Sequence, residues 1–331
     1  MIYWLKWAGE QALRLVLLLI ATIVITYILI QLSPIDPVQS YIGADMMRVG
    51  PEQRAAIAAY WGWDEPPLIQ FGKWSAAFLQ GDLGTSTIYR LPVTEVIGER
   101  FVSSVALMIS SWVIAGIVGF MIGSIAAMQR DKWLDRILRT ICYTLASAPL
   151  FWVALLMLLV GAVWLGLFPI GLAAPAGVLA SNITVWDKIY HMLLPSATLA
   201  IAGIAPLALH TRQKMIDILD SDFVLYARAK GERGITLYRR HIWRNALLPA
   251  LTVQFASFGE LFGGAILVEQ VFSYPGLGQA TIEAALRGDV PLLLGLVIFS
   301  TVFVFVGNTM ADLLYGLVDP RIRLLRQGGK G

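Results

Sequence analysis

Residue types that could perform catalysis are few in this chain and lie far apart. The three histidines, His191, His210 and His241, are too scattered in sequence for a metal cage or a Ser-His dyad. No G-x-x-x-x-G-K-[ST] phosphate-binding loop is present, and Gly329-Lys330-Gly331 forms a tail rather than a nucleotide site. The H-E-x-x-H and G-x-S-x-G motifs of hydrolases are also absent. The sequence therefore predicts no catalytic residue, no metal site and no ATP hydrolysis by this chain.

Acidic residues inside apolar segments are the remaining candidates for chemistry. Glu260 lies about twelve residues into the apolar run 248–271, on the order of 18 Å along a helix axis. Because a charge in hydrocarbon costs on the order of 3 kcal/mol, this residue needs a role. Either it lines a solute pathway together with Ser257, about 60° away around the helix, or it holds a neighbouring helix. Glu269 faces the opposite way, so the two carboxylates do not form a pair.

Small or short polar residues recur at four-residue spacing within the apolar runs. This spacing places both members of a pair on one helix face, where small residues allow close approach and amides or carboxyls bond between helices. The pairs predicted to serve helix packing are Gly259 with Gly263, Asn308 with Asp312, and Gly119 with Gly123.

The composition places the chain in the membrane. Hydrophobic residues make up 57% of it and charged residues 14%, with a mean hydropathy of +0.70, so a soluble protein of this length could not bury its apolar surface. Apolar runs of about 17 to 25 residues cross a bilayer as helices. The sequence therefore predicts an all-α protein with six spans at about residues 13–32, 102–128, 141–168, 192–209, 248–271 and 291–318.

The distribution of lysine and arginine predicts the orientation of these spans. With the N-terminus in the cytosol, 18 of the 25 basic residues lie on the cytosolic side, as the positive-inside rule requires. Both termini are then cytosolic, and the basicity serves contacts with anionic lipids and partners rather than with nucleic acid. The predicted parts are the first span with an extracytoplasmic loop (1–101), a core transmembrane domain with a cytoplasmic loop at about 210–247 (102–318), and a cytoplasmic tail (319–331).

A basic segment at 221–249, SDFVLYARAKGERGITLYRRHIWRNALLP, lies between two of the spans and is typical of a docking element. Ser221 or Asp222 can cap a first helix, Gly231 can end it in the left-handed conformation, and Pro249 marks the approach to the next span. The predicted docking residues are Tyr226, Ala227, Arg228, Ala229, Lys230, Gly231, Arg240, Arg244, Asn245 and Pro249.

This segment resembles the signature loop of permease subunits from binding-protein-dependent ABC importers of the peptide/nickel branch, which carry an ARAKG-like core and an RNALLP-like end. A GDLG-x-S string at 81–86, an E-x-x-F-x-x-P-G-x-G string at 269–278 and a DPRIR string at 319–323 extend the resemblance over nearly the whole chain. The generic loop begins Glu-Ala-Ala, whereas this chain has Leu225, Tyr226 and Ala227, so no glutamate contact to an ATPase is implied.

The resemblance implies a type I importer permease of the bacterial inner membrane. The implied partners are a second homologous permease subunit, two cytosolic ATP-binding subunits that hold ATP and Mg²⁺ and receive the basic loop, and a periplasmic or lipid-anchored solute-binding protein. No cofactor is expected in this chain itself. The implied solute is a peptide or a related small molecule.

Two alternatives stay open from the sequence. The same machinery could import nickel or a metal chelate such as an opine or metallophore complex. A secondary transporter is less favoured, because it would bring its own coupling-ion site and usually an internal repeat, and the Glu260 region has no second copy.

Overall fold

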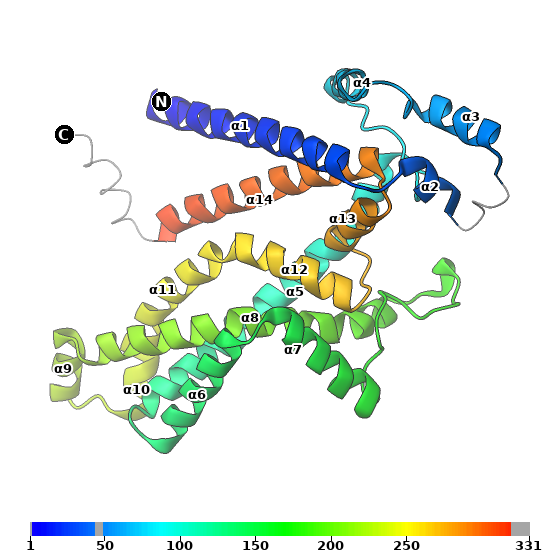
Figure 1. Cartoon of the computed structure of the whole chain (residues 1–331). Coiled ribbons are helices and arrows are strands. Elements are labelled where there is room, and N and C mark those ends of the chain that lie inside the picture. The colour runs from blue at the N-terminus through cyan, green and yellow to red at the C-terminus, as the bar shows by residue number, and fades with distance from the viewer. Residues whose placement is uncertain (1, 44–48, 319–331) are drawn as a thin grey trace. The chain divides into compact units, whose positions relative to one another are not determined.

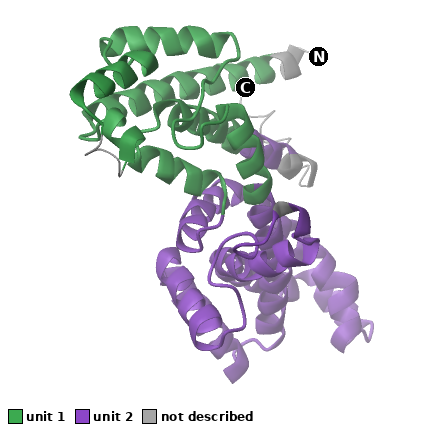
Figure 2. Ribbon diagram, turned by 90° about the vertical axis from the view of Figure 1, so that its right-hand side faces the viewer, with its two compact units in different colours: residues 1–104, 275–305 green, residues 105–274, 306–331 purple. Residues whose placement is uncertain are grey.

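The computed structural model describes residues 2–43 and 49–318 (Figure 1). These residues form helices joined by loops, and the only β-type pairing among them is one isolated bridge between Thr85 and Pro92. The predicted all-α class is therefore confirmed. Packing divides the chain into two compact units, residues 1–104 with 275–305 (unit 1) and residues 105–274 with 306–331 (unit 2), which Figure 2 distinguishes by colour.

Unit 1 is built from the N-terminal helices and a returning segment near residue 290. Prolines start its short helices, because Pro37, Pro51 and Pro67 each stand at a first helical position, where the missing N–H costs no bond. Its helices are α1 (Ile2–Leu32), α2 (Pro37–Ile42), α3 (Pro51–Trp61), α4 (Pro67–Leu79), the start of α5 (Val93–Met128), α13 (Leu277–Leu286) and the start of α14 (Val290–Val318).

A buried carboxylate fastens the loop before α5 to the start of α14. Asp289 is fully buried and accepts hydrogen bonds from the Ser86 hydroxyl at 2.6 Å and the Ile88 backbone N–H at 3.0 Å. Its other oxygen accepts the Leu292 N–H at 3.2 Å, which satisfies one of the free amides at the start of α14. The G-D-L-G-T-S string therefore ends in a structural anchor.

A polar network on α13 holds the same loop. The Tyr89 hydroxyl donates to Glu283 at 2.7 Å, and Arg100 donates to the Tyr89 oxygen and to Gln279, each at 3.1 Å. Burial and the bond to Glu283 raise the pKa of Tyr89 to about 12, so this hydroxyl remains a hydrogen-bond donor at neutral pH. The loop and α13 therefore form one surface within unit 1.

Unit 2 contains the remaining helices, with α8 as its longest complete helix. Both α6 and α11 pack against α8. Its elements are the remainder of α5 and α14, α6 (Trp133–Ser147), α7 (Leu150–Met157), the π-helical η2 (Leu158–Trp164), the short η3 (Ala180–Asn182), α8 (Val185–Leu219), α9 (Asp222–Ala229), α10 (Gly234–Leu237), the π-helical η4 (Tyr238–Ile242), α11 (Trp243–Ala256) and α12 (Phe258–Val271).

Six membrane spans are present in the described residues if two bent helix pairs each count as one. Four single helices are long and apolar enough to cross a bilayer, namely Lys6–Leu32, Val93–Met128, Val185–Leu219 and Val290–Leu313. The two bent pairs are Trp133–Ser147 with Leu150–Trp164, at 107°, and Gly234–Ala256 with Phe258–Val271, at 55°. The predicted number of spans therefore holds, whereas two of them are not straight.

The prediction of one continuous helix over 141–168 was wrong, because the chain turns sharply before Pro149. Ala148 has an extended backbone, with φ −79° and ψ 130°. A proline excludes the preceding residue from the helical region and lacks the N–H that would continue the ladder. A search for apolar runs does not detect this break, because one proline leaves the mean hydropathy of the run almost unchanged.

The role predicted for Pro249, marking the approach to a span, was also wrong. Pro195 and Pro206 both lie inside α8, and Pro249 lies inside α11. Helices that cross membranes tolerate proline because neighbouring groups satisfy the freed carbonyls. The division into parts on either side of the membrane stays a prediction for the ranges 1–101, 102–318 and 210–247. The predicted cytoplasmic tail, 319–331, lies outside the described residues.

Candidate functional site

A cavity in unit 2 brings Glu260 and Ser257 together with residues of three other helices. Its volume is about 280 Å³, and it is lined mainly by apolar side chains with a few polar groups, a pattern common to small-molecule sites. The lining residues are Leu150 of α7, then Leu199, Ala202, Gly203, Pro206 and Leu207 of α8, then Val253, Gln254 and Ala256 of α11, followed by Ser257, Glu260, Leu261 and Gly264.

The two predicted pathway residues lie at a helix break rather than on one continuous helix. Ser257 joins α11 to α12 at the 55° bend, and its hydroxyl donates to the Gln254 carbonyl at 3.0 Å. Glu260 stands in the first turn of α12 and is exposed in this chain. The free N–H groups and dipole of a helix N-terminus favour a carboxylate there, which lowers the cost of keeping a charge inside an apolar segment.

Gln254 is a third polar residue at this site, and the sequence argument missed it. It is buried, its amide donates to the Trp112 carbonyl at 2.7 Å, and the Trp112 indole donates to the Gln254 carbonyl at 3.1 Å. This reciprocal pair ties α11 to α5 beside the cavity. The available signal was an amide side chain three residues before Ser257 in an otherwise apolar run.

The predicted packing residues have different environments. A Cβ on Gly259 would lie 3.2 Å from the Asn308 amide nitrogen, so α12 and the unit 2 part of α14 approach closely there. A Cβ on Gly263 would meet no described atom within 4 Å, and Asp312 is exposed in this chain. Gly259 and Asn308 thus lie at a close approach of two helices within this chain. The packing role predicted for Gly263 and Asp312 stays a prediction.

The docking loop, defined here as residues 221–249, has the predicted helix, break and helix. Helix α9 ends at Ala229, and Gly231 follows with a left-handed φ of +92°. The Gly231 N–H donates to the Arg228 carbonyl at 2.9 Å, and the Glu232 N–H donates to the Ala227 carbonyl at 3.1 Å. These two bonds are the Schellman pattern, which confirms the conformation predicted for Gly231.

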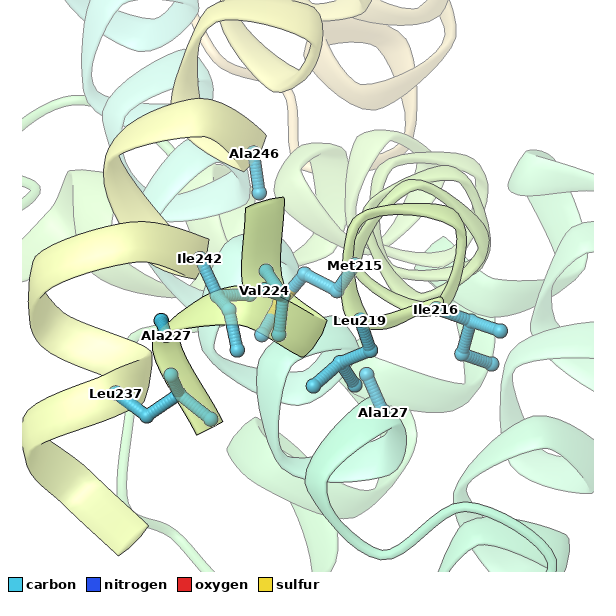
Figure 3. Packing of buried hydrophobic residues seen from close by; sticks show 9 residues of the cluster. All are labelled: Ala127, Met215, Ile216, Leu219, Val224, Ala227, Leu237, Ile242 and Ala246. Atoms are coloured by element: carbon cyan, nitrogen blue, oxygen red, sulfur yellow. The ribbon is translucent and has the colours of Figure 1, made fainter. Parts of the chain in front are cut away.

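A hydrophobic cluster beneath the docking loop joins it to the transmembrane helices. Figure 3 shows side chains of α5, α8, α9, α10, η4 and α11 converging there. Ala227, predicted to lie on the docking surface, instead packs into this cluster, because it faces the side of α9 opposite the exposed Tyr226 and Arg228. The members are Ala127, Met215, Ile216, Leu219, Val224, Ala227, Leu237, Ile242 and Ala246.

The outward side of the docking loop is basic and also exposes large apolar side chains, among them Leu225 and Ile235. The Lys230 ammonium lies 4.7 Å from the centre of the Tyr226 ring. Glu232, directly after the break at Gly231, pairs with Arg240 at 3.3 Å and with the His241 ring at 2.9 Å, which holds the turn after α9 to η4. The predicted docking residues that are exposed are Tyr226, Arg228, Ala229, Lys230, Gly231, Arg240, Arg244 and Asn245.

Comparisons with known proteins point to one family. The family described as "Binding-protein-dependent transport system inner membrane component" matches residues 119–324. The chain is 32% identical to the oligopeptide transport system permease protein AppB of Bacillus subtilis, over 95% of this chain and 98% of that protein. It is 34% identical to a putative peptide transport system permease protein of Brucella abortus (93% and 95%) and 33% identical to the glutathione transport system permease protein GsiC of Salmonella paratyphi A (96% and 99%).

Proposed function

Because the chain belongs to the binding-protein-dependent transport system inner membrane components, we propose that it is the permease subunit through which an ABC importer moves peptides. It is a multi-pass protein of the bacterial inner membrane. The relatives named for oligopeptide, dipeptide and glutathione transport favour peptides. The nickel or metal-chelate alternative has no comparable support.

The observation that carries this proposal is the cavity containing Glu260 and Ser257. The carboxylate at the start of α12 can meet the terminal ammonium of a peptide, and the Ser257 hydroxyl and Gln254 side chain at the bend supply further polar contacts. The apolar remainder of the lining accepts varied side chains. A second homologous permease subunit completes the pathway on the exposed side of Glu260.

The docking loop supplies the link to ATP. Its outer face, basic and partly apolar, docks on the ATP-binding subunits, of which the importer has two and which hold ATP and Mg²⁺. A solute-binding protein delivers the peptide. The cluster beneath the loop makes α9 and the ends of α5 and α8 move together. Closure of the ATP-binding subunits therefore becomes a rigid-body movement of the helices around the cavity.

We expect the complete importer in lipid vesicles to take up peptide in an ATP-dependent manner, and Glu260→Gln to weaken that uptake selectively. With saturating loaded binding protein, uptake of a peptide with a free amino terminus should fall about fivefold, the effect of losing one exposed charge pair of about 1 kcal/mol. Uptake of its N-acetylated form should not change.

The matched control is Glu10→Gln, which alters an exposed glutamate of α1 outside the cavity. Equal effects on both peptides would contradict the contact with the ammonium group. Wild-type vesicles that bind the partner subunits but show no ATP-dependent peptide uptake would contradict the peptide importer itself.

The membrane orientation gives a second expected result. In a Cys142→Ser background, which removes the single buried cysteine, Glu52→Cys should react with an impermeant maleimide in intact spheroplasts. Lys132→Cys should react only after permeabilisation, because the basic segments lie on the cytosolic side. Both positions are exposed in this chain. Labelling of both from the same side would refute the six-span orientation.

A further inference from the structure

A buried ion pair joins α6 to α8 in unit 2. Asp135, in the first turn of α6, is fully buried and accepts two parallel bonds from Arg212 of α8, Nε to Oδ1 at 2.6 Å and Nη2 to Oδ2 at 2.7 Å. Arg139 lies 3.4 Å from the same carboxylate, and the Asp131 N–H donates to it at 3.0 Å. Both oxygens of Asp135 are thus engaged, and Arg212 holds them in a fixed, two-pronged geometry.

A second contact connects the same two segments about two helical turns nearer the docking loop along α8. Arg130, in the turn before α6, donates from Nη1 to both carboxylate oxygens of Asp220 at 3.2 and 2.9 Å. Asp220 caps the C-terminus of α8 and stands directly before the docking loop. The turn into α6 is therefore held to α8 at two points, Arg212 and Asp220.

The ion pair lies between the docking loop and the cavity. On one side, α8 continues through Asp220 into α9, and the cluster in Figure 3 joins them. On the other side, α6 leads through the bend before Pro149 into α7, whose Leu150 lines the cavity. A Cβ on Gly264 of α12 would lie 3.0 Å from Leu150, so α7 also touches the helix that carries Glu260.

The geometry of the pair indicates a mechanical role more than a stabilising one. A buried ion pair adds little to stability, because the cost of removing two charges from water offsets their attraction. A bidentate arginine and carboxylate do, however, fix distance and orientation together, whereas apolar contacts between helices can slide.

We propose that Asp135 and Arg212 form a clamp that makes α6 and α7 follow α8 when the ATP-binding subunits displace the docking loop. The clamp rests on the proposed importer function and adds to it a named transmission element outside both the docking loop and the cavity. Asp135 and Arg212 are positioning residues, because neither touches the solute site.

The test uses the complete importer in lipid vesicles and measures peptide taken up per ATP hydrolysed. Asp135→Asn keeps the shape of the side chain but removes its charge. Arg212→Lys keeps the charge but loses the guanidinium group that makes two parallel bonds. We expect assembled complexes that still hydrolyse ATP, with uptake per ATP reduced about tenfold or more, a coupling loss within the usual range.

The matched control is Asp217→Asn. Asp217 is an exposed carboxylate of α8 that bonds to Gln213 and Lys214 of the same helix, so its loss should leave coupling unchanged. Wild-type coupling in both single variants would overturn the clamp. Failure of both variants to assemble would also overturn it, because the ion pair would then be a requirement for folding. If the wild-type complex itself moves no peptide, the proposed function fails instead.

Discussion

Gly231→Val should abolish solute uptake while leaving a membrane-inserted subunit that assembles with its partner permease. Gly231 has φ +92° and donates the first of the two Schellman bonds that end α9. A Cβ there would meet no atom of the described residues within 4 Å, so the cost within this chain is conformational. That cost is on the order of 1–2 kcal/mol, and larger for a β-branched side chain. The variant chain avoids this conformational strain by changing the direction of the segment after α9, and this changes the surface that meets the ATP-binding subunits.

The measurement is uptake together with ATP hydrolysis in vesicles that contain the complete importer. The ATP-binding subunits should either fail to dock or hydrolyse ATP without driving transport. Gly231→Asn is the matched control, because asparagine tolerates the left-handed region and should retain most of the uptake. Near-normal uptake by Gly231→Val, with hydrolysis still stimulated by the binding protein, would show that the docking loop is not the transmission element.

Gly123→Ala should prevent stable assembly, although it adds a single methyl group. Its Cβ would lie 2.5 Å from the Ala208 carbonyl oxygen and 2.7 Å from the Thr211 Cβ. A backbone oxygen cannot move aside as a flexible side chain can, so α5 and α8 must separate. Overpacking of this kind costs on the order of 3 kcal/mol, a large share of the stability of a typical domain.

The amount of intact complex recovered in detergent, and its thermal unfolding temperature, measure this effect. Gly116→Ala is the matched control on the same helix, because its Cβ would lie 3.5 Å from the Gln254 amide, an ordinary contact. Equal recovery of the two variants would refute the close approach of α5 and α8 at Gly123. Loss of both would indicate a general intolerance of α5 to substitution.

Local sequence was sufficient wherever a structural feature depends on neighbouring residues. The left-handed glycine after α9 follows from the A-R-A-K-G string, because a Cβ at that position is disfavoured whatever surrounds it. The close packing predicted for Gly119 and Gly123 is confirmed, since a Cβ on either would press against α8. Local rules nevertheless placed Ser257 and Glu260 on one straight helix, and the bend at Ser257 contradicts this.

The buried polar pairings within each unit join residues far apart in the chain. Asp135 and Arg212 are 77 positions apart, and Ser86 and Asp289 are 203 apart. In the sequence, Arg212 was only one of many basic residues that set the orientation, because a charge reveals its side of the membrane but not its partner. A partner is chosen by which helix faces come together, which depends on the packing of the whole unit.

The amino-acid sequence by itself determined the helical class, the membrane location and the break in the docking loop, because apolar run length, composition and glycine geometry act over a few residues. The family followed from the resemblance of the docking loop and three shorter strings to known permeases. Only the tertiary structure decided that α6 turns by 107° into α7, that Ala227 faces inward, and that Glu260 stands at a helix start beside a cavity. These features depend on contacts between distant segments, since a bend direction or a cavity wall exists only once helices have packed against one another.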